Sequence, residues 1–256
     1  MEAVRKPFQG VRNIIRFNWQ YYAISVILII IGSVALNAFP NRFNSWIAFL
    51  IVLFVTLNLI SILVSYFVYD LSGLYKFGWL KEFVVAPAKR IFNINAGYDE
   101  TSGILKNHFS NAEITVYDFY DPDKHTEISI RRARKAYPPH PGTIHIPTHT
   151  IPAENSSAEF VFLILACHEI RDENERVLFF RELKRILNKN GRIIVVEHVR
   201  DMANLIAYNI GAFHFFSKRS WLRTFAAAGL TVVNTKKITP FITLFIINQD
   251  GNPHKD

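Results

Sequence analysis

Three side chains that can do chemistry stand after predicted strands in the second part of this 256-residue chain. Gly97 follows the strand-like run 92–95, Asp118 ends "ITVYD", and His168 follows "FVFLILAC". A glycine lets the backbone approach a bound ligand closely. An aspartate at the end of the next strand can accept hydrogen bonds from ribose hydroxyls. A histidine of near-neutral pKa can take a proton from a phenol or another hydroxyl. The pattern predicts a nucleoside site beside an acid–base residue.

The stretch "FNINAGYDETSGIL" (92–105) reads as a strand, a glycine and the start of a helix. Its residues 99–102 are polar, and they can cap that helix and lie against the positive end of its dipole. Cofactor loops are normally richer in glycine, so an ordinary strand-to-helix turn and a modified cofactor loop are both open. Asp118 favours the cofactor loop, because an acidic residue about 20 residues beyond such a loop can bind ribose.

Short apolar strands alternate with amphipathic helices from residue 91 onward, which is typical of a parallel sheet covered by helices. We predict strands near 91–95, 113–117, 143–146, 159–165 and 192–197, with helices near 100–109, 124–136, 173–187 and 218–228. Two last apolar runs, 231–237 and 241–248, predict an antiparallel edge. The predicted fold class is α/β, a doubly wound, mostly parallel Rossmann-like sheet, whose ligands bind at the carboxyl ends of its strands.

Several stretches over residues 91–248 resemble class I S-adenosylmethionine-dependent methyltransferases, especially the group of menaquinone and ubiquinone methyltransferases. The most specific is "ELKRILNKNGRIIVVE" (182–197), where a helix, a turn with Gly191 expected at positive φ, and a strand follow one another. The longer run 151–198 and "FSKRSWLRTFAAAGLTVVNTKKI" (216–238) add to the resemblance. Of the family's glycine-rich first loop, only the central glycine, Gly97, is kept.

The resemblance implies S-adenosyl-L-methionine as cofactor, with a site built from residues after each strand. These residues are Asn95, Ala96 and Gly97, then Asp118 and Phe119, Thr148 and His149, and Ala166 and Cys167. Thr148 and His149 stand where the family often has an aspartate that meets the adenine amino group. His168 is the candidate general base, and His198 and His214 are weaker candidates.

Two uncharged runs, 22–39 and 46–69, precede this domain, and each has about the length that a helix needs to cross a bilayer. Pro40 and two asparagines in "PNRFNSW" predict a tight turn between them. We therefore predict a two-helix transmembrane hairpin over 21–70, a juxtamembrane linker over 71–90 and a polar tail over 249–256. The alternative is a buried helical hairpin of a soluble protein, but two such uncharged runs are rare in soluble cores.

Basic residues flank the hairpin at its outer ends, in the segment 1–20 and after residue 75, whereas the turn carries only Arg42. The positive-inside rule then predicts a multi-pass membrane protein with both termini and the domain in the cytoplasm. The formal net charge of +8 suits a lipid bilayer as the anionic partner, and we predict no nucleic-acid partner. The "RRARK" run (131–135) is interpreted as a basic helix face toward solvent or lipid.

The aromatic stretch 205–221 suits either an apolar substrate, the membrane surface or core packing. The single cysteine, Cys167, is interpreted as a core residue rather than a nucleophile. The histidines show no metal-ligand spacing, so no metal site is predicted. The sequence thus predicts a membrane-anchored methyltransferase for a lipophilic small molecule such as a phenol, quinone or lipid-like compound. The alternative is a non-catalytic domain of this fold that serves as a binding or scaffold protein.

Overall fold

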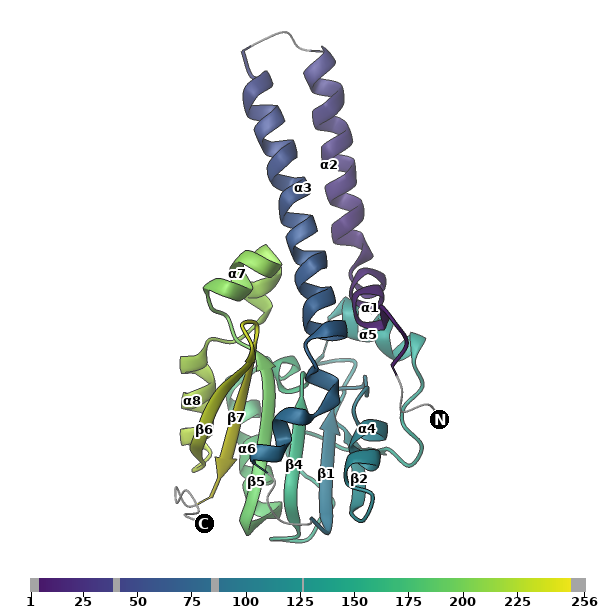
Figure 1. Cartoon of the computed structure of the whole chain (residues 1–256). Coiled ribbons are helices and arrows are strands. Elements are labelled where there is room, and N and C mark those ends of the chain that lie inside the picture. Colours follow the sequence, from purple (N-terminus) through teal and green to yellow (C-terminus); the bar gives the residue numbers. More distant parts are fainter. Residues whose placement is uncertain (1–4, 39–41, 84–87, 126, 250–256) are drawn as a thin grey trace.

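The computed structural model describes residues 5–38, 42–83, 88–125 and 127–249. Two long helices, α2 (Trp19–Ala38) and α3 (Asn44–Tyr66), stand away from an α/β domain as a hairpin (Figure 1). Both are long and apolar enough to cross a membrane, and the apolar window of each is uncovered by the rest of the protein. This exposure differs from that of a hairpin in a soluble core. Pro40 lies outside the described residues.

The short helix α1 (Gln9–Phe17) precedes the hairpin and packs at its base. The backbone N–H groups of Gly10 and Val11 each donate to the Asp70 carboxylate at 2.8 Å, just beyond the end of α3. Gly10 is required there, because a Cβ at this position would come within 2.3 Å of the Tyr69 Cβ. The two ends of the hairpin therefore meet at the same side of the molecule, against the domain.

The segment after α3 is a structural layer of the domain, which corrects the linker predicted over 71–90. It forms a π-helical turn, η1 (Phe67–Leu71), and two 3₁₀ turns, η2 (Leu74–Lys76) and η3 (Gly78–Glu82). Leu74, Phe77 and Leu80 are buried against one face of the sheet. The sequence pattern of apolar and basic residues reflects this packing, in which one side of the segment covers the sheet. Residues 84–87 and 250–256, part of the predicted linker and tail, lie outside the described residues.

The sheet has seven strands among the described residues, in the order β3-β2-β1-β4-β5-β7-β6. Its parallel strands are β1 (Arg90–Asn95), β2 (Glu113–Asp118), β3 (Ile144–His145), β4 (Ala158–Ile164) and β5 (Leu187–His198). The last two, β6 (Thr231–Thr239) and β7 (Ile242–Asn248), are antiparallel, and β7 pairs with β5. The predicted fold class and antiparallel edge are confirmed.

Helices cover both faces of this sheet. They are α4 (Ser102–His108), α5 (Ile128–Ala136), α6 (Glu173–Ile186), α7 (Met202–Tyr208) and α8 (Lys218–Ala227), with 3₁₀ turns η4 (Cys167–Glu169) and η5 (Asn209–His214). Helices α6 and α8 pack Phe179, Phe180 and Trp221 into one core, and η1–η3 with α4 enclose the other. Each predicted strand and helix of the domain lies within a few residues of its predicted position, whereas α7 and the 3₁₀ turns were not predicted.

Gly191 differs from the sequence prediction, because it lies within β5 and not in a left-handed turn. The strand bulges here: Leu187 pairs with Ala158, and Arg192 pairs with Phe160. A Cβ on Gly191 would lie 2.9 Å from the Ala158 carbonyl oxygen and 2.7 Å from Leu187 Cδ1. The glycine is therefore needed for close backbone approach rather than for a positive φ.

Candidate functional site

The carboxyl ends of the parallel strands lie at the edge of the sheet that faces the hairpin (Figure 1). Asn95 at the end of β1 and Asp118 at the end of β2 are paired in register. β4 runs beside β1 and continues into η4, which contains His168. Strand pairing therefore brings together the glycine loop, the aspartate and the histidine that the sequence analysis selected.

The glycine loop is a tight turn held by its own asparagine. Gly97 has φ of 90°, and its N–H donates to Asn95 Oδ1 at 2.9 Å. The Asp99 carboxylate accepts from the N–H groups of Thr101 and Ser102, each at 2.9 Å, so the predicted cap of α4 is present. Only glycine adopts this φ without strain, which explains why this glycine is the one kept.

Arg134 fills the space in front of the glycine. A Cβ built on Gly97 would lie 2.3 Å from Arg134 Nη1, and the guanidinium stacks over the Tyr120 ring at 4.4 Å. The same Nη1 donates to Asp118 Oδ2 at 2.5 Å, while Asp118 Oδ1 accepts from the Tyr120 N–H at 2.8 Å. The carboxylate proposed for ribose is thus paired with an arginine. This corrects the interpretation of "RRARK" as a purely outward basic face.

Helix α1 covers the glycine loop from the hairpin side. The Asn13 side chain donates to Tyr98 Oη at 2.7 Å and accepts from the Tyr137 hydroxyl at 2.8 Å. The Phe17 ring packs edge-on against both tyrosine rings. Sequence reasoning missed this contact, because nothing in the local pattern links residue 13 to residue 98.

Thr148 and His149, the two residues predicted to contact adenine, lie in different surroundings in the structure. Thr148 is buried and donates to Glu175 Oε1 at 2.5 Å, whereas His149 is exposed. Phe119 packs between His125 and Phe179 in the core. Thr148 therefore lies on the helix side of the loop, and His149 does not join it.

Four of the residues predicted as cofactor contacts are closed off from the surface. Phe119 and Cys167 are fully buried, and Ala96 and Ala166 are nearly so. At these four positions the side chains offer almost no surface to a ligand. Burial raises the pKa of the Cys167 thiol, which fits a core residue rather than a nucleophile.

His168 lies in a cluster of carboxylates and a second histidine. Its Nδ1 is 2.7 Å from Glu197 Oε2, and its Nε2 is 3.4 Å from Glu169 Oε1. Burial acts to lower the pKa of His168, but the charges of Glu197 and Glu169 outweigh it and raise that pKa to about 10. At neutral pH this imidazole carries a proton, so the near-neutral general base expected from the sequence is absent in this state.

His214 of η5 reaches the same cluster. Its Nδ1 lies 3.2 Å from Glu127 Oε1, and its Nε2 lies 3.8 Å from Glu169 Oε1. Glu127 and Glu169 raise the pKa of His214 against the lowering effect of burial. Sequence spacing gave no reason to group residues 169 and 214, which only the fold brings together.

His198 joins the hairpin to the sheet. Its Nδ1 faces two oxygen acceptors, Asn204 Oδ1 and the Phe241 carbonyl, each at 3.1 Å, and its Nε2 lies 2.7 Å from the Tyr69 hydroxyl. The ring also stacks on Phe215. Burial lowers the pKa of His198 to about 3, so it is neutral. His198 is therefore a packing residue of the joint rather than an acid–base group.

The comparisons with known proteins agree with this geometry. Residues 94–195 match the family described as "Methyltransferase domain". A solved S-adenosylmethionine-dependent methyltransferase from Aquifex aeolicus is 14% identical, with a TM-score of 0.50 over 75% of this chain and 96% of that one. The domain has the class I methyltransferase fold. A solved protein of Pyrococcus horikoshii is also 14% identical, with a TM-score of 0.51 over 70% of this chain and 90% of that one. No curated protein sequence matches the chain.

S-adenosylmethionine is the cofactor that this family and fold indicate. The domain has Gly97 after β1 and Asp118 at the end of β2, and these two strands are neighbours in the sheet. The space against Gly97 contains the Arg134 guanidinium, so a ligand can approach this glycine only after that side chain has rotated away.

Proposed function

We propose that this chain is a membrane-anchored S-adenosylmethionine-dependent methyltransferase that takes a lipophilic acceptor from the bilayer. A phenol or quinol of the kind methylated by menaquinone- and ubiquinone-type enzymes is the acceptor class that we favour. The lipid bilayer is the proposed partner, with both termini and the domain in the cytoplasm.

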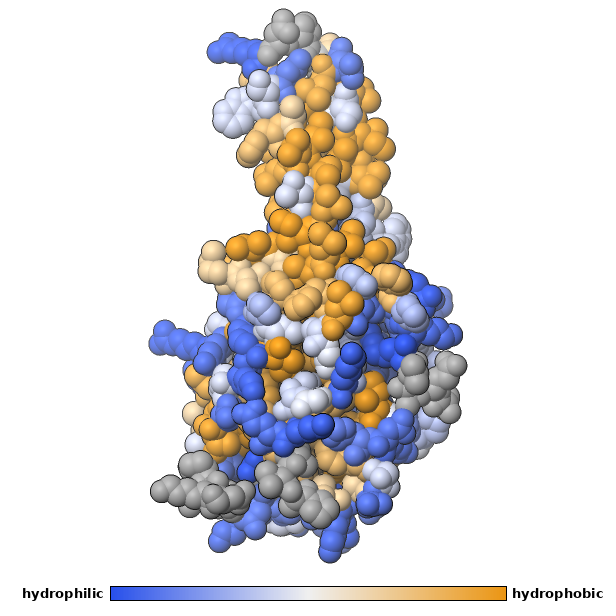
Figure 2. Space-filling model, viewed as in Figure 1, coloured by the Kyte–Doolittle hydropathy of each residue, from blue (hydrophilic) through white to orange (hydrophobic). Residues whose placement is uncertain are grey.

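The observation that carries this proposal is an apolar surface at the base of the hairpin. Helix α7 contacts α3, and it continues into η5, the turn that contains His214 (Figure 1). Ile210 and Phe213 of η5 are 77% and 62% exposed, and Met202 and Ile206 of α7 are also exposed. Figure 2 shows the apolar surface of the hairpin continuing onto this end of the domain. An apolar surface that is continuous with two uncovered apolar helices suits insertion into a bilayer.

This apolar surface lies next to the cluster of His168, Glu169 and His214 at the strand ends. Phe213 and Ile210 lie on the outer side of the same turn whose His214 faces Glu169. An acceptor that leaves the bilayer beneath η5 would thus arrive at the strand ends without crossing water. Of the aromatic stretch 205–221, Trp221 belongs to the core and Phe215 packs on His198, so Phe213 is the aromatic that would meet lipid.

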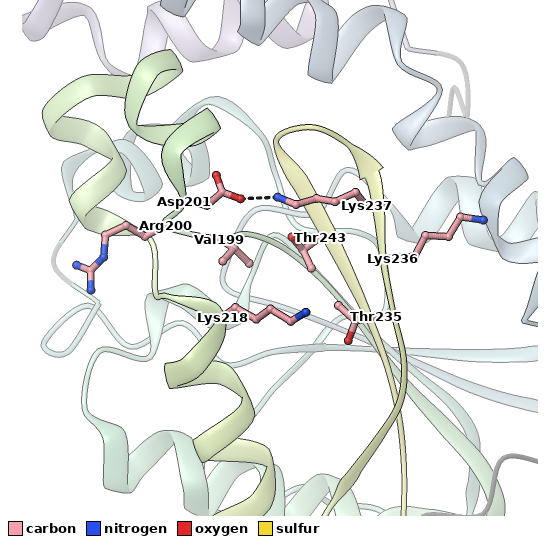
Figure 3. A pocket seen from close by; sticks show the side chains of 8 residues that line it. All are labelled: Val199, Arg200, Asp201, Lys218, Thr235, Lys236, Lys237 and Thr243. Carbon is pink, nitrogen blue, oxygen red and sulfur yellow. Dashed lines mark hydrogen bonds and ion pairs between the residues drawn. The ribbon is translucent and has the colours of Figure 1, made fainter.

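A basic pocket with a volume of about 230 Å³ lies next to the carboxyl end of β5, beside the β6–β7 ribbon (Figure 3). Arg200, Lys218, Lys236 and Lys237 line it, and Asp201 pairs with Lys237 at 2.6 Å. Its β6–β7 ribbon turns close to the hairpin, because Phe241 packs against Phe67. The excess of positive charge would favour anionic lipid headgroups at this end of the domain.

S-adenosylmethionine, when bound, supplies the methyl group as a sulfonium that a nucleophile displaces. Gly97 would allow the close backbone approach, and Asp118 would accept from ribose hydroxyls. His168 is held in place by Glu197 and Glu169 and would lie beside the acceptor oxygen. The η5 surface would exclude water from the acceptor.

The test compares two acceptors with the full-length protein in lipid vesicles. Methyl transfer from S-adenosylmethionine is measured to a phenol with a long alkyl chain and to a water-soluble phenol with the same ring. Replacing Ile210 by Asp should lower the rate with the alkylated phenol at least tenfold and leave the soluble phenol within twofold. Leu178→Asp, which changes an exposed apolar residue on α6, is the matched control. Equal loss with both acceptors would refute uptake from the bilayer.

A non-catalytic binding domain is the second candidate, and the arginine in front of Gly97 is the observation that favours it. Titration of the full-length protein with S-adenosylmethionine separates the two. Submillimolar binding supports the enzyme, and absence of binding in both the parent and Arg134→Ala supports the scaffold.

A further inference from the structure

We propose that His168, Glu169 and His214 form a binding site for one divalent transition-metal ion. One ring nitrogen of His168, one of His214 and one oxygen of Glu169 all lie within 4.8 Å of one another. Ligands about 2.1 Å from a tetrahedral metal lie about 3.4 Å apart, so small side-chain rotations close this set around an ion. Sequence analysis predicted no metal ligands, because His214 is far from His168 and Glu169 in the chain and no local spacing links them.

Both histidines are held in the way that metal-binding histidines require. His168 Nδ1 is 2.7 Å from Glu197 Oε2, and His214 Nδ1 is 3.2 Å from Glu127 Oε1. A carboxylate on one ring nitrogen fixes the proton there and directs the other nitrogen at the metal. In both rings the nitrogen left over is Nε2, and both Nε2 atoms point to Glu169 Oε1.

Glu169 provides an observation that is independent of the histidines. The residue is only 5% exposed, and its Oε2 has no hydrogen-bond partner among the described residues. A buried carboxylate oxygen without a partner is costly, and an ion would satisfy it. Arg171 also ties the two ligand-bearing turns together, because its Nη1 donates to the His168 carbonyl at 3.2 Å and to the His214 carbonyl at 2.5 Å.

Two imidazoles and one carboxylate suit Zn²⁺, Fe²⁺ or Mn²⁺ better than Mg²⁺ or Ca²⁺, which prefer all-oxygen sites. Three protein ligands leave at least one coordination position open, as in catalytic rather than structural sites. If the proposed methyltransferase function holds, that position would take the oxygen of the acceptor and lower its pKa, which would favour the nucleophilic anion. Metal binding itself does not depend on that function.

The experiment uses the full-length protein in detergent, stripped with a chelator and titrated with Zn²⁺ alone by calorimetry. We expect one ion per chain with micromolar or tighter affinity. His214→Ala should weaken binding at least 100-fold, and Glu127→Gln should weaken it about 10- to 100-fold, as expected for a residue that orients a ligand. His145→Ala, which removes an exposed histidine of β3, should leave binding unchanged.

Cobalt gives a second measurement, because the visible absorption of bound Co²⁺ reports imidazole coordination and should be lost in His214→Ala. Circular dichroism of each variant shows whether it has kept its fold. Absence of stoichiometric Zn²⁺ binding by the parent, or equal losses in His145→Ala and His214→Ala, would overturn the proposal. These assays contain no cofactor and no methyl acceptor. Their result therefore tests the metal site separately from the proposed methyltransferase function.

Discussion

Replacing Arg134 by alanine is expected to tighten the binding of S-adenosylmethionine about fivefold. The arginine pairs with the carboxylate proposed for ribose, and it occupies the space that Gly97 leaves open. Binding of the cofactor therefore has to break an ion pair that the free protein contains. The variant no longer contains that pair, so binding no longer includes the cost of breaking it.

The magnitude follows from the exposure of the two partners. The Asp118 side chain is 6% exposed and that of Arg134 is 34% exposed, so solvent screens part of the interaction. Exposed pairs contribute about 0.2–1 kcal/mol, and the burial of Asp118 places this one at the upper end. A difference of about 1 kcal/mol corresponds to about fivefold in Kd.

The assay is calorimetric titration of the full-length parent, Arg134→Ala and Arg131→Ala in detergent. Arg131 lies on the same helix and is exposed, so its removal controls for the loss of one positive charge. Asp118→Asn should weaken binding by about 1.5–3 kcal/mol, because it removes charge-assisted hydrogen bonds to ribose. In that background Arg134→Ala should bring no further gain, since the competing pair is already absent.

Weaker binding in Arg134→Ala would refute this reasoning. It would mean that the guanidinium contacts the cofactor directly, for example its carboxylate. An unchanged Kd in both Arg134→Ala and Asp118→Asn would place the cofactor elsewhere.

Three further predictions concern the packing and the orientation of the chain. The pKa of His198 is lowered to about 3, so this side chain is neutral in the folded protein. The folded state should therefore lose stability as pH falls below about 6.5, by up to about 1.4 kcal/mol per pH unit. The melting temperature of His198→Gln should depend less steeply on pH than that of the parent. Gly10→Ala should cost about 1–3 kcal/mol because an added methyl overlaps η1, whereas Gly78→Ala, with open space around it, should melt like the parent. An impermeant thiol reagent added outside intact cells should label a cysteine at Ser45 and not one at Ser110; the reverse result would invert the proposed orientation.

Much of the fold could be predicted from the sequence because its signals are local. Periodic apolar runs define strands and helices wherever one face is buried, and each predicted element is present. The positive φ of Gly97 follows from a turn of three residues, and the cap by Asp99 from contacts within the next three. Gly191 shows the limit of such local signals. A glycine is needed there because the Ala158 carbonyl of the neighbouring strand leaves no room for a side chain, and the local sequence does not reveal that neighbour.

The site was predictable only where strand pairing determines it. Asn95, Asp118 and His168 follow parallel strands, so the sheet order alone makes them neighbours. The roles of the neighbours were not predictable, because they depend on partners from elsewhere in the chain. Arg134 forms an ion pair with Asp118 and so changes what that carboxylate can bind. Glu197 raises the pKa of His168 and so changes its protonation.

The sequence by itself determined that this chain contains two long uncharged helices and an α/β domain, because hydropathy and periodicity are properties of contiguous residues. Only the tertiary structure decided that α1 covers the glycine loop, that 74–83 is part of the core, and that His168, Glu169 and His214 converge. Asn13 and Tyr98 are 85 positions apart, and His214 lies 45 positions beyond Glu169. The energies of such contacts arise from packing and from charges brought together in low-dielectric surroundings. Local pattern carries no information about such pairs until the fold brings them into contact.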